Sequence, residues 1–405
     1  MAVSRAGRLR AMPELVLRGG RPWGHPDGAD ILVRDGSIVR VALGIDAPRA
    51  EVVDVSDRLL LPGLVDAHTH LDKTLCGGPW VPHSAGDALA DRIANERRRR
   101  FELGLPSVDY ATALLERMVA AGTSYVRSHT DIDPEVGLRG VETIRAAAAR
   151  LDGRVTVEQV AFPQSGLLTN PGTAELLEEA LRSGVEAVGG LDPAGVDQDP
   201  AGHLDLLFEL AERYGAGIDI HLHDAGTLGA WELGLIADRT REAGLAGRVT
   251  VSHAYGFAQV APTEQDRLIE QLADAGVTVL TAAVYSFPVP PIKRLGAAGV
   301  NVACGHDGIR DLWGPYGSGD MLERAMHVAY RSGFRRDEDI ELALEAATHG
   351  GARTLGLESY GLTEGARADI VVVAARTPAE AVVARPVREL VLKAGHIVAR
   401  HGALV

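Results

Sequence analysis

Histidine and aspartate residues recur along this chain at spacings that suit metal binding. His68 and His70 are two residues apart, and His221 and His223 repeat the spacing. Residues two apart in an extended strand face the same side, so each pair can direct two imidazoles at one ion. Imidazole and carboxylate ligands that leave one coordination position open suit Zn²⁺ or Fe²⁺, which can activate a bound water for hydrolysis near neutral pH.

Further groups of this kind follow two other apolar runs, Ser252-His253 and His306-Asp307. Ligands so far apart in sequence can share an ion only if the fold brings the ends of their strands together. At the carboxyl end of an eight-stranded α/β barrel the strand ends do meet, and polar residues there are typically catalytic. The alternative is that these are structural histidines whose hydrogen bonds are satisfied in the core.

The elements that such a barrel needs are visible in the sequence. Short apolar, β-branched runs alternate with Ala/Leu/Glu/Arg-rich segments of helical periodicity, which is typical of repeated strand–helix units. There are eight such runs, at residues 64–70, 124–131, 155–162, 187–192, 217–223, 249–253, 277–281 and 301–307. The sequence therefore predicts an α/β protein built on a (β/α)8 TIM barrel.

The two ends of the chain have a different pattern. Residues 14–61 alternate apolar and polar positions between glycine turns, and the pattern returns after Gly361. We predict that both ends pair into one small β-sandwich domain beside the barrel. The predicted division is residues 1–62 and 361–405 for the two parts of the small β-domain, and residues 63–360 for the metal-dependent barrel.

Composition narrows the possible partners. The 405 residues carry a formal net charge of −14, which argues against a nucleic-acid partner because such proteins usually present a basic face. The arginine run at 97–100 is interpreted as a solvated helix face. No apolar stretch of about 18 residues could span a membrane, and the N-terminal 15 residues are expected to be a frayed leader rather than a secretory signal.

Two cysteines, Cys76 and Cys304, are too few for a disulfide framework or a four-thiolate zinc site, so a cytoplasmic location is expected. No dinucleotide-binding or phosphate-binding glycine motif is present, so no nucleotide cofactor is implied. A homo-oligomer is compatible with the sequence, which leaves the oligomeric state open.

Three segments resemble a known family. LPGLVDAHTHLDK resembles the first-strand signature of the amidohydrolase superfamily, and VEQVAFPQSG and CGHDGIRDLWGPYGSGDML resemble cytosine deaminases. The resemblance runs through most of the chain. It implies that His68, His70, His221 and Asp307 hold the metal and that His253 steadies the attacking water or the oxyanion.

One departure from cytosine deaminases concerns the substrate. They carry a proton-shuttling glutamate three residues after the metal histidine of the fifth strand, where this chain has Asp224 preceded by His223. Lys73, Asp192, His223 and Trp313 make the chain more similar to triazine side-chain aminohydrolases of the isopropylammelide type. The resemblance thus implies a small nitrogen-heterocycle substrate, of either the pyrimidine or the triazine kind.

The positions of the lysines indicate how many metal ions the site holds. Some members of the superfamily hold two metals bridged by a carboxylated lysine on the fourth strand, but the only lysines here are Lys73, Lys293 and Lys393. None of them lies on that strand. A single divalent ion, Zn²⁺ or Fe²⁺, is therefore predicted.

The hypothesis that results is hydrolytic removal of ammonia or an amine from the ring. Asp307 deprotonates the metal water, which attacks an amidine-like carbon while His253 stabilises the adduct. His223, Asp224 or Lys73 then returns the proton.

We expect the Gln164 amide to provide a hydrogen-bond donor and an acceptor to the edge of the substrate ring. The alternative is that it only makes a hydrogen bond within its loop. Asp192 contacts the substrate or a catalytic histidine, or caps a helix ahead of Pro193. We expect Trp313 to pack against the ring and residues 286–293 to border the pocket; the alternative for both is packing that contacts no ligand. Hydrolysis of a cyclic or acyclic amide is the alternative reaction, and a non-catalytic ligand-binding barrel is a more distant one.

Overall fold

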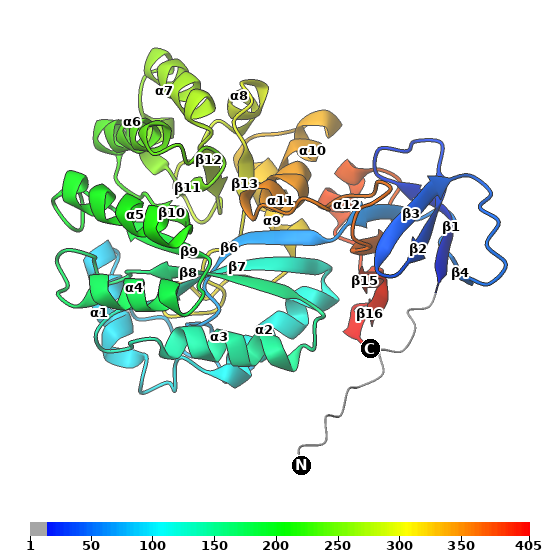
Figure 1. The fold of residues 1–405 in the computed structure, drawn as a ribbon, viewed down its shortest axis with the longest axis horizontal. Coiled ribbons are helices and arrows are strands. Elements are labelled where there is room, and N and C mark those ends of the chain that lie inside the picture. Colours follow the sequence, from blue (N-terminus) through cyan, green and yellow to red (C-terminus); the bar gives the residue numbers. More distant parts are fainter. Residues whose placement is uncertain (1–13) are drawn as a thin grey trace.

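The computed structural model describes residues 14–405, so the predicted leader lies almost wholly outside the described residues. Within them, the chain forms a barrel and a β-sheet domain that flanks it on one side (Figure 1). The described N-terminal strand and the C-terminus both lie in the flanking domain, so the chain leaves this domain, builds the barrel and returns.

The barrel contains all eight predicted strands, in parallel and in sequence order. They are β6 (Leu64–Thr69), β7 (Thr123–Asp131), β8 (Thr156–Phe162), β9 (Ala187–Leu191), β10 (Gly217–His221), β11 (Val249–Ser252), β12 (Thr278–Thr281) and β13 (Val302–Cys304). The ring closes where the Asp307 N–H donates to the His68 carbonyl at 2.9 Å. Because β6, β10 and β11 end at or beside a histidine, their carboxyl ends bring the predicted ligands to one place.

Helices surround the strands, as alternating strand–helix units require. They are α1 (Leu89–Arg99), α2 (Val108–Ala120), α3 (Arg139–Arg150), α4 (Thr173–Arg182), α5 (Pro200–Tyr214), α6 (Gly226–Glu242), α7 (Pro262–Ala275), α8 (Ile292–Ala297), α9 (Met321–Arg331), α10 (Asp337–Glu345) and α11 (Gly351–Thr354). In α7, Pro262 opens the first turn and Gly276 ends the helix at a φ of 67°, the positions these residues favour. Among residues 14–405 no helix is both long and apolar enough to cross a membrane.

The flanking domain is made by both ends of the chain. Its strands are β1 (Leu15–Pro22), β2 (Ala29–Arg34), β3 (Ser37–Ala42), β4 (Glu51–Asp54), β5 (Leu59–Pro62), β14 (Ile370–Val373), β15 (Arg388–Lys393), β16 (His396–Arg400) and β17 (Ala403–Leu404), with helix α12 (Pro378–Ala384). The antiparallel pair β5 and β14 joins the N-terminal strands to the C-terminal ones. The domain boundaries at residues 62 and 361 stay a prediction.

The interpretation of residues 97–100 as a solvated face is wrong at its last residue. Arg100 is only 4% exposed, and its guanidinium donates to both carboxylate oxygens of Asp133 at 2.8 and 3.0 Å. Asp133 follows the end of β7, so the guanidinium ties α1 to the barrel mouth. A charge pattern read along one helix cannot show a partner that lies in a distant loop.

Candidate active site

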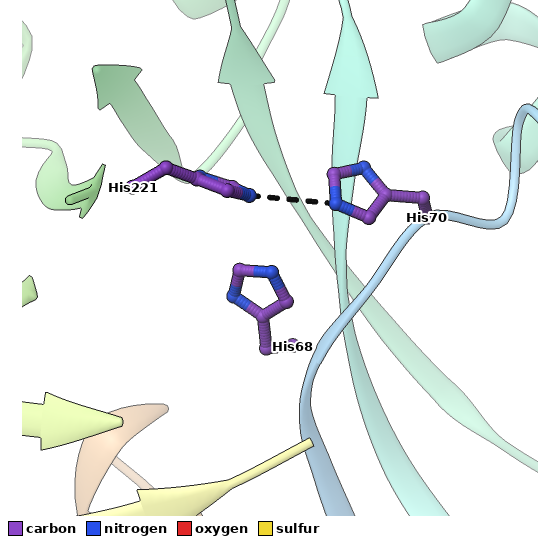
Figure 2. Close-up of side chains that lie close together, drawn as sticks. All are labelled: His68, His70 and His221. Carbon is purple, nitrogen blue, oxygen red and sulfur yellow. Dashed lines mark hydrogen bonds between the residues drawn. The ribbon is translucent and has the colours of Figure 1, made fainter. Parts of the chain in front are cut away.

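Three predicted ligands meet at the mouth of the barrel: His68 from β6, His70 just after it and His221 at the end of β10. Figure 2 shows the three rings turned toward one another, with the Nε2 atoms of His70 and His221 3.4 Å apart. All three residues are buried. Their ring nitrogens lie within 4.8 Å of one another, a cluster that fits a metal ion.

Hydrogen bonds fix which nitrogen of two of these rings is free. The Ser252 hydroxyl donates to Asp219 at 2.7 Å, so its oxygen accepts from His68 Nδ1 at 2.9 Å. His70 Nδ1 lies 3.1 Å from the His129 carbonyl, which can only accept. Both Nε2 atoms therefore keep a lone pair that points into the cluster, the tautomer that a metal ligand needs.

The fourth predicted ligand, Asp307, lies beside this cluster. Its Oδ1 atom is 3.3 Å from His70 Nε2 and 3.9 Å from His68 Nε2. Asp307 has a φ of 65°, a left-handed conformation that aspartate adopts more readily than most other residues. Burial by itself raises the pKa of Asp307, but contact with His70 and His253 lowers it well below the usual range, so the carboxylate stays ionised.

A second pair of histidines lies next to the cluster. His253 is buried, and neither of its ring nitrogens has a hydrogen-bond partner in the part of the chain that the structure describes. Burial and the charge of His223 lower the pKa of His253 to about 3, which keeps it neutral. His223 stacks on it at 4.6 Å and bonds to Asp192 at 2.8 Å. Burial lowers the pKa of His223, but the Asp192 carboxylate outweighs burial and raises it.

Asp192 contacts a histidine and does not cap a helix. Its carboxylate accepts the backbone N–H of His223 at 2.5 Å and that of Asp224 at 3.3 Å. The next helix, α5, is capped by Asp199 instead. Asp192 therefore orients His223 from the loop of the neighbouring strand.

Asp224, like the buried His253, lies outside the lining of the cavity above the histidines. Its carboxylate accepts the Gly195 N–H at 2.9 Å. Burial and the nearby Asp192 charge raise the pKa of Asp224. The neighbouring His223, in contrast, lines this cavity. Of these two neighbours, the geometry thus favours His223 as the one that reaches a ligand.

Lys73 and Gln164 form one unit in the cavity wall. The Lys73 ammonium donates to Gln164 Oε1 at 2.8 Å and pairs with Asp131 at 2.8 Å. Burial lowers the pKa of Lys73, but Asp131 and Glu96 outweigh it and raise the pKa above the usual range. Because lysine can only donate, the Gln164 oxygen must face it, which leaves the Gln164 amide N–H groups for a ligand.

The sequence interpretation missed Glu96, which completes this wall. Glu96 is buried on α1, accepts the indole N–H of Trp313, and lies 3.5 Å from the Lys73 ammonium. Trp313 lies in turn under that ammonium, 5.5 Å from the ring centre. Glu96 and Trp313 are 217 residues apart in the sequence, and no local pattern marks the pair.

His129 and Asp219 were also missed, and they stand below the metal cluster. Asp219 accepts from Ser252 and pairs with Arg127 at 3.3 Å, and it lies 3.5 Å from His129. His306, noted in the sequence, bonds to Asp66 at 2.6 Å. These groups support the histidine cluster. Asp219 could have been predicted from the sequence, because it lies two residues before His221 and therefore on the same face of the strand.

A cavity of about 860 Å³ opens above the cluster. The predicted residues that line it are His70, Lys73, Gln164, His221, His223, Asp307 and Trp313. The segment at 286–293 borders it through Phe287 and Pro288, as predicted. The structure therefore gathers most predicted site residues around one space.

Comparisons with known proteins identify the family of the chain. A sequence profile described as "Amidohydrolase family" matches residues 108–399. N-isopropylammelide isopropyl amidohydrolase from Pseudomonas sp. strain ADP is 33% identical over 381 residues, which cover 93% of this chain and 94% of that protein.

Two solved structures extend the similarity to three dimensions. N-isopropylammelide isopropylaminohydrolase from Burkholderia multivorans superimposes with a TM-score of 0.93 and 47% identity, covering 97% of this chain and 100% of that one. 5-Methylcytosine deaminase from Klebsiella pneumoniae liganded with 5-fluorocytosine gives a TM-score of 0.82 at 24% identity, covering 96% and 97%. The second similarity concerns the fold alone.

Proposed function

This chain belongs to the amidohydrolase family, and from that premise we propose that it hydrolyses an exocyclic carbon–nitrogen bond of a triazine- or pyrimidine-like ring. The observation that carries the proposal is the free His68 and His70 Nε2 atoms beside Asp307 at the base of a cavity. The named activity of the 47% identical Burkholderia protein supports the triazine branch.

We propose that one divalent ion, Zn²⁺ or Fe²⁺, is held by His68, His70, His221 and Asp307. When bound, it would lower the pKa of a water molecule and so provide a nucleophile at neutral pH. The other His/Asp groups support a count of one, because Asp219 is occupied by Arg127 and Ser252, and Asp131 by Lys73. Metal analysis of the purified protein tests both identity and count.

We assign a separate catalytic step to each of three side chains. The Asp307 carboxylate lies 3.3 Å from His70 Nε2, so beside a bound ion it would be placed to accept the proton of the attacking water. His253 is neutral with no partner among residues 14–405, so it can hydrogen-bond to the oxygen that adds to the ring carbon. His223, with its raised pKa, is the better candidate to protonate the departing nitrogen, since Lys73 holds its proton tightly.

The side chains in the cavity wall favour a substrate ring that carries hydrogen-bond acceptors. Gln164 presents N–H groups because Lys73 occupies its oxygen. A ring oxo group is the natural partner of such a donor. Trp313, fixed by Glu96, offers a flat face along the same wall.

The test is turnover with identified products. Metal-replete protein is incubated with ammelide, N-alkylammelides, cytosine, isocytosine and cyclic amides, and ammonia, amine and ring products are followed by mass spectrometry. Release of amine or ammonia with the ring intact is expected. Ring opening would favour the amide-hydrolase alternative, and metal-bound protein without turnover would contradict the proposed substrate class.

We propose a cytoplasmic location as well. Cys76 and Cys304 are both buried and unpaired with each other, which suits a reducing compartment. Fractionation of the native host tests this directly.

A further inference from the structure

Four aromatic rings form a continuous series in the lining of the cavity. Tyr255 lies 5.4 Å from His253 and stacks on Phe287 at 4.7 Å with an angle of 12° between the rings. Tyr285 continues the series 6.3 Å from Phe287, and Tyr316 lies 6.0 Å from Tyr285. We call these four residues the aromatic arm. It leads from the catalytic histidines to the protein surface.

The loop that carries two of these rings is held firmly in place. Arg331 on α9 donates to the backbone carbonyls of Phe287 at 2.6 Å and Val284 at 3.3 Å. Arg324, about two turns before Arg331 on the same face of α9, donates to the Ala282 carbonyl. Tyr285 has a φ of 49°, a strained conformation that surrounding structure must impose. The arm is therefore preorganised before any ligand arrives.

Tyr285 also spans the cavity mouth. Its hydroxyl lies against Gly314 in the loop after β13, where an added Cβ would come within 1.7 Å of it. Tyr285 and Tyr316 are nonetheless 49% and 71% exposed, and both line the cavity. Burial raises the pKa of Tyr285 to about 12, so its ring is uncharged at neutral pH. Exposed aromatic rings that gather around one cavity, rather than lying scattered over the surface, are typical of a binding site.

The size of the cavity also indicates a ligand larger than a single ring. About 860 Å³ lies near the upper end of the range for pockets that enclose drug-sized ligands. A single six-membered ring with a small alkyl group fills only a fraction of that space. Part of the remainder is lined by the aromatic arm, and the rest is lined by residues that include Asp87, Arg92 and Glu323.

We propose that the aromatic arm is a subsite for a planar or aromatic substituent on the departing nitrogen, so that this enzyme prefers N-aryl or N-benzyl aminoheterocycles to N-methyl ones. The inference rests on the proposed function. In the reaction, water forms a new C–O bond to the ring carbon, the exocyclic C–N bond breaks, and the amine leaves with a proton. Ring stacking along the arm stabilises the substituent throughout.

The experiment compares kcat/KM for N-benzylammelide and N-methylammelide. We expect N-benzylammelide to be favoured by about 3- to 10-fold, the size of one or two aromatic contacts. Tyr316→Ala and Tyr285→Leu should lower this preference, whereas Tyr316→Phe should keep it. Trp231→Ala, an exposed aromatic residue on α6 outside the cavity, is the matched control and should leave the ratio unchanged.

Equal kcat/KM for the two substrates, or an unchanged ratio in Tyr316→Ala, would overturn the subsite. If neither compound is turned over, the triazine branch of the proposed function fails instead. Calorimetric binding of the same two compounds to the metal-replete protein then decides the subsite: tighter binding of N-benzylammelide supports it, and equal binding contradicts it.

Discussion

At the base of the cavity, every functional side chain lies at or just after the end of a barrel strand, whereas the wall combines Lys73 and Gln164, which also follow strands, with Glu96 from α1 and Trp313 from the long loop after β13. We call the first group the floor (His68, His70, His221, His253 and Asp307) and the second the wall (Lys73, Glu96, Gln164 and Trp313). Backbone hydrogen bonds of the strands fix the floor. The wall depends on side-chain contacts such as that between Glu96 and Trp313.

This difference predicts different kinetic effects for substitutions in the floor and in the wall. The floor provides groups for bond making and breaking, so its loss should remove turnover while substrate still binds. The wall provides contacts to the bound ring, so its loss should mainly weaken binding. Substitutions in each region can test whether this division is real.

The largest expected effect is at the floor. Asp307→Asn keeps the shape of the side chain but cannot accept a proton, so kcat should fall by about 100-fold to 10,000-fold. Asp205→Asn, an exposed carboxylate on α5 that pairs with Arg239, is the control and should keep wild-type kcat. Steady-state kinetics with metal content measured in parallel check this. A variant that retains a tenth of wild-type kcat would show that Asp307 is not the general base.

A smaller loss is expected one step away from the floor. Asp192→Asn removes the charge that orients His223, and kcat should fall by about 10- to 100-fold, as for other residues that orient catalytic histidines. Asp199→Asn lies in the same loop but only caps α5, where asparagine caps as well as aspartate, so it should leave kcat unchanged. Equal losses of kcat in both variants would show that the loop, and not the contact to His223, matters.

At the wall, the effect should move from kcat to KM. Glu96→Gln keeps an acceptor for the Trp313 indole but removes the charge opposite Lys73, so KM should rise by about 5- to 20-fold with a smaller change in kcat. Glu135→Gln breaks contacts to Arg97 and Arg100 beside the same helix without touching the wall. If Glu135→Gln raises KM equally, Glu96 only anchors α1.

The same division explains what the sequence could predict. Strand period and strand ends are local properties, so all eight strands and the meeting of His68, His70 and His221 could be predicted. Whether Asp192 capped a helix or met a histidine depended on the path of the following loop, and the pattern left it open. Glu96 and the burial of Arg100 depend on contacts between segments far apart in the chain, which no local pattern encodes.

The smallest expected effect lies outside both regions, at Asp197. Its carboxylate accepts from His203 at 2.6 Å and from the Thr169 hydroxyl at 2.8 Å, and so ties the loop after β8 to α5. Burial raises the pKa of Asp197, but these bonds outweigh it and lower the pKa to about 2. A folded-state pKa below the unfolded value of about 3.9 means stability that is present above that value and lost as pH falls toward 2.

Asp197→Asn should therefore be about 1 to 2 kcal/mol less stable than the wild type at pH 6, and the gap should narrow between pH 4 and pH 2. Urea unfolding at several pH values measures this, with Asp205→Asn as the exposed control. Because Asp197 does not line the cavity, kcat and KM at pH 7 should match the wild type. A gap that stays constant down to pH 2 would mean that Asp197 stabilises the loops through shape and not through its charge.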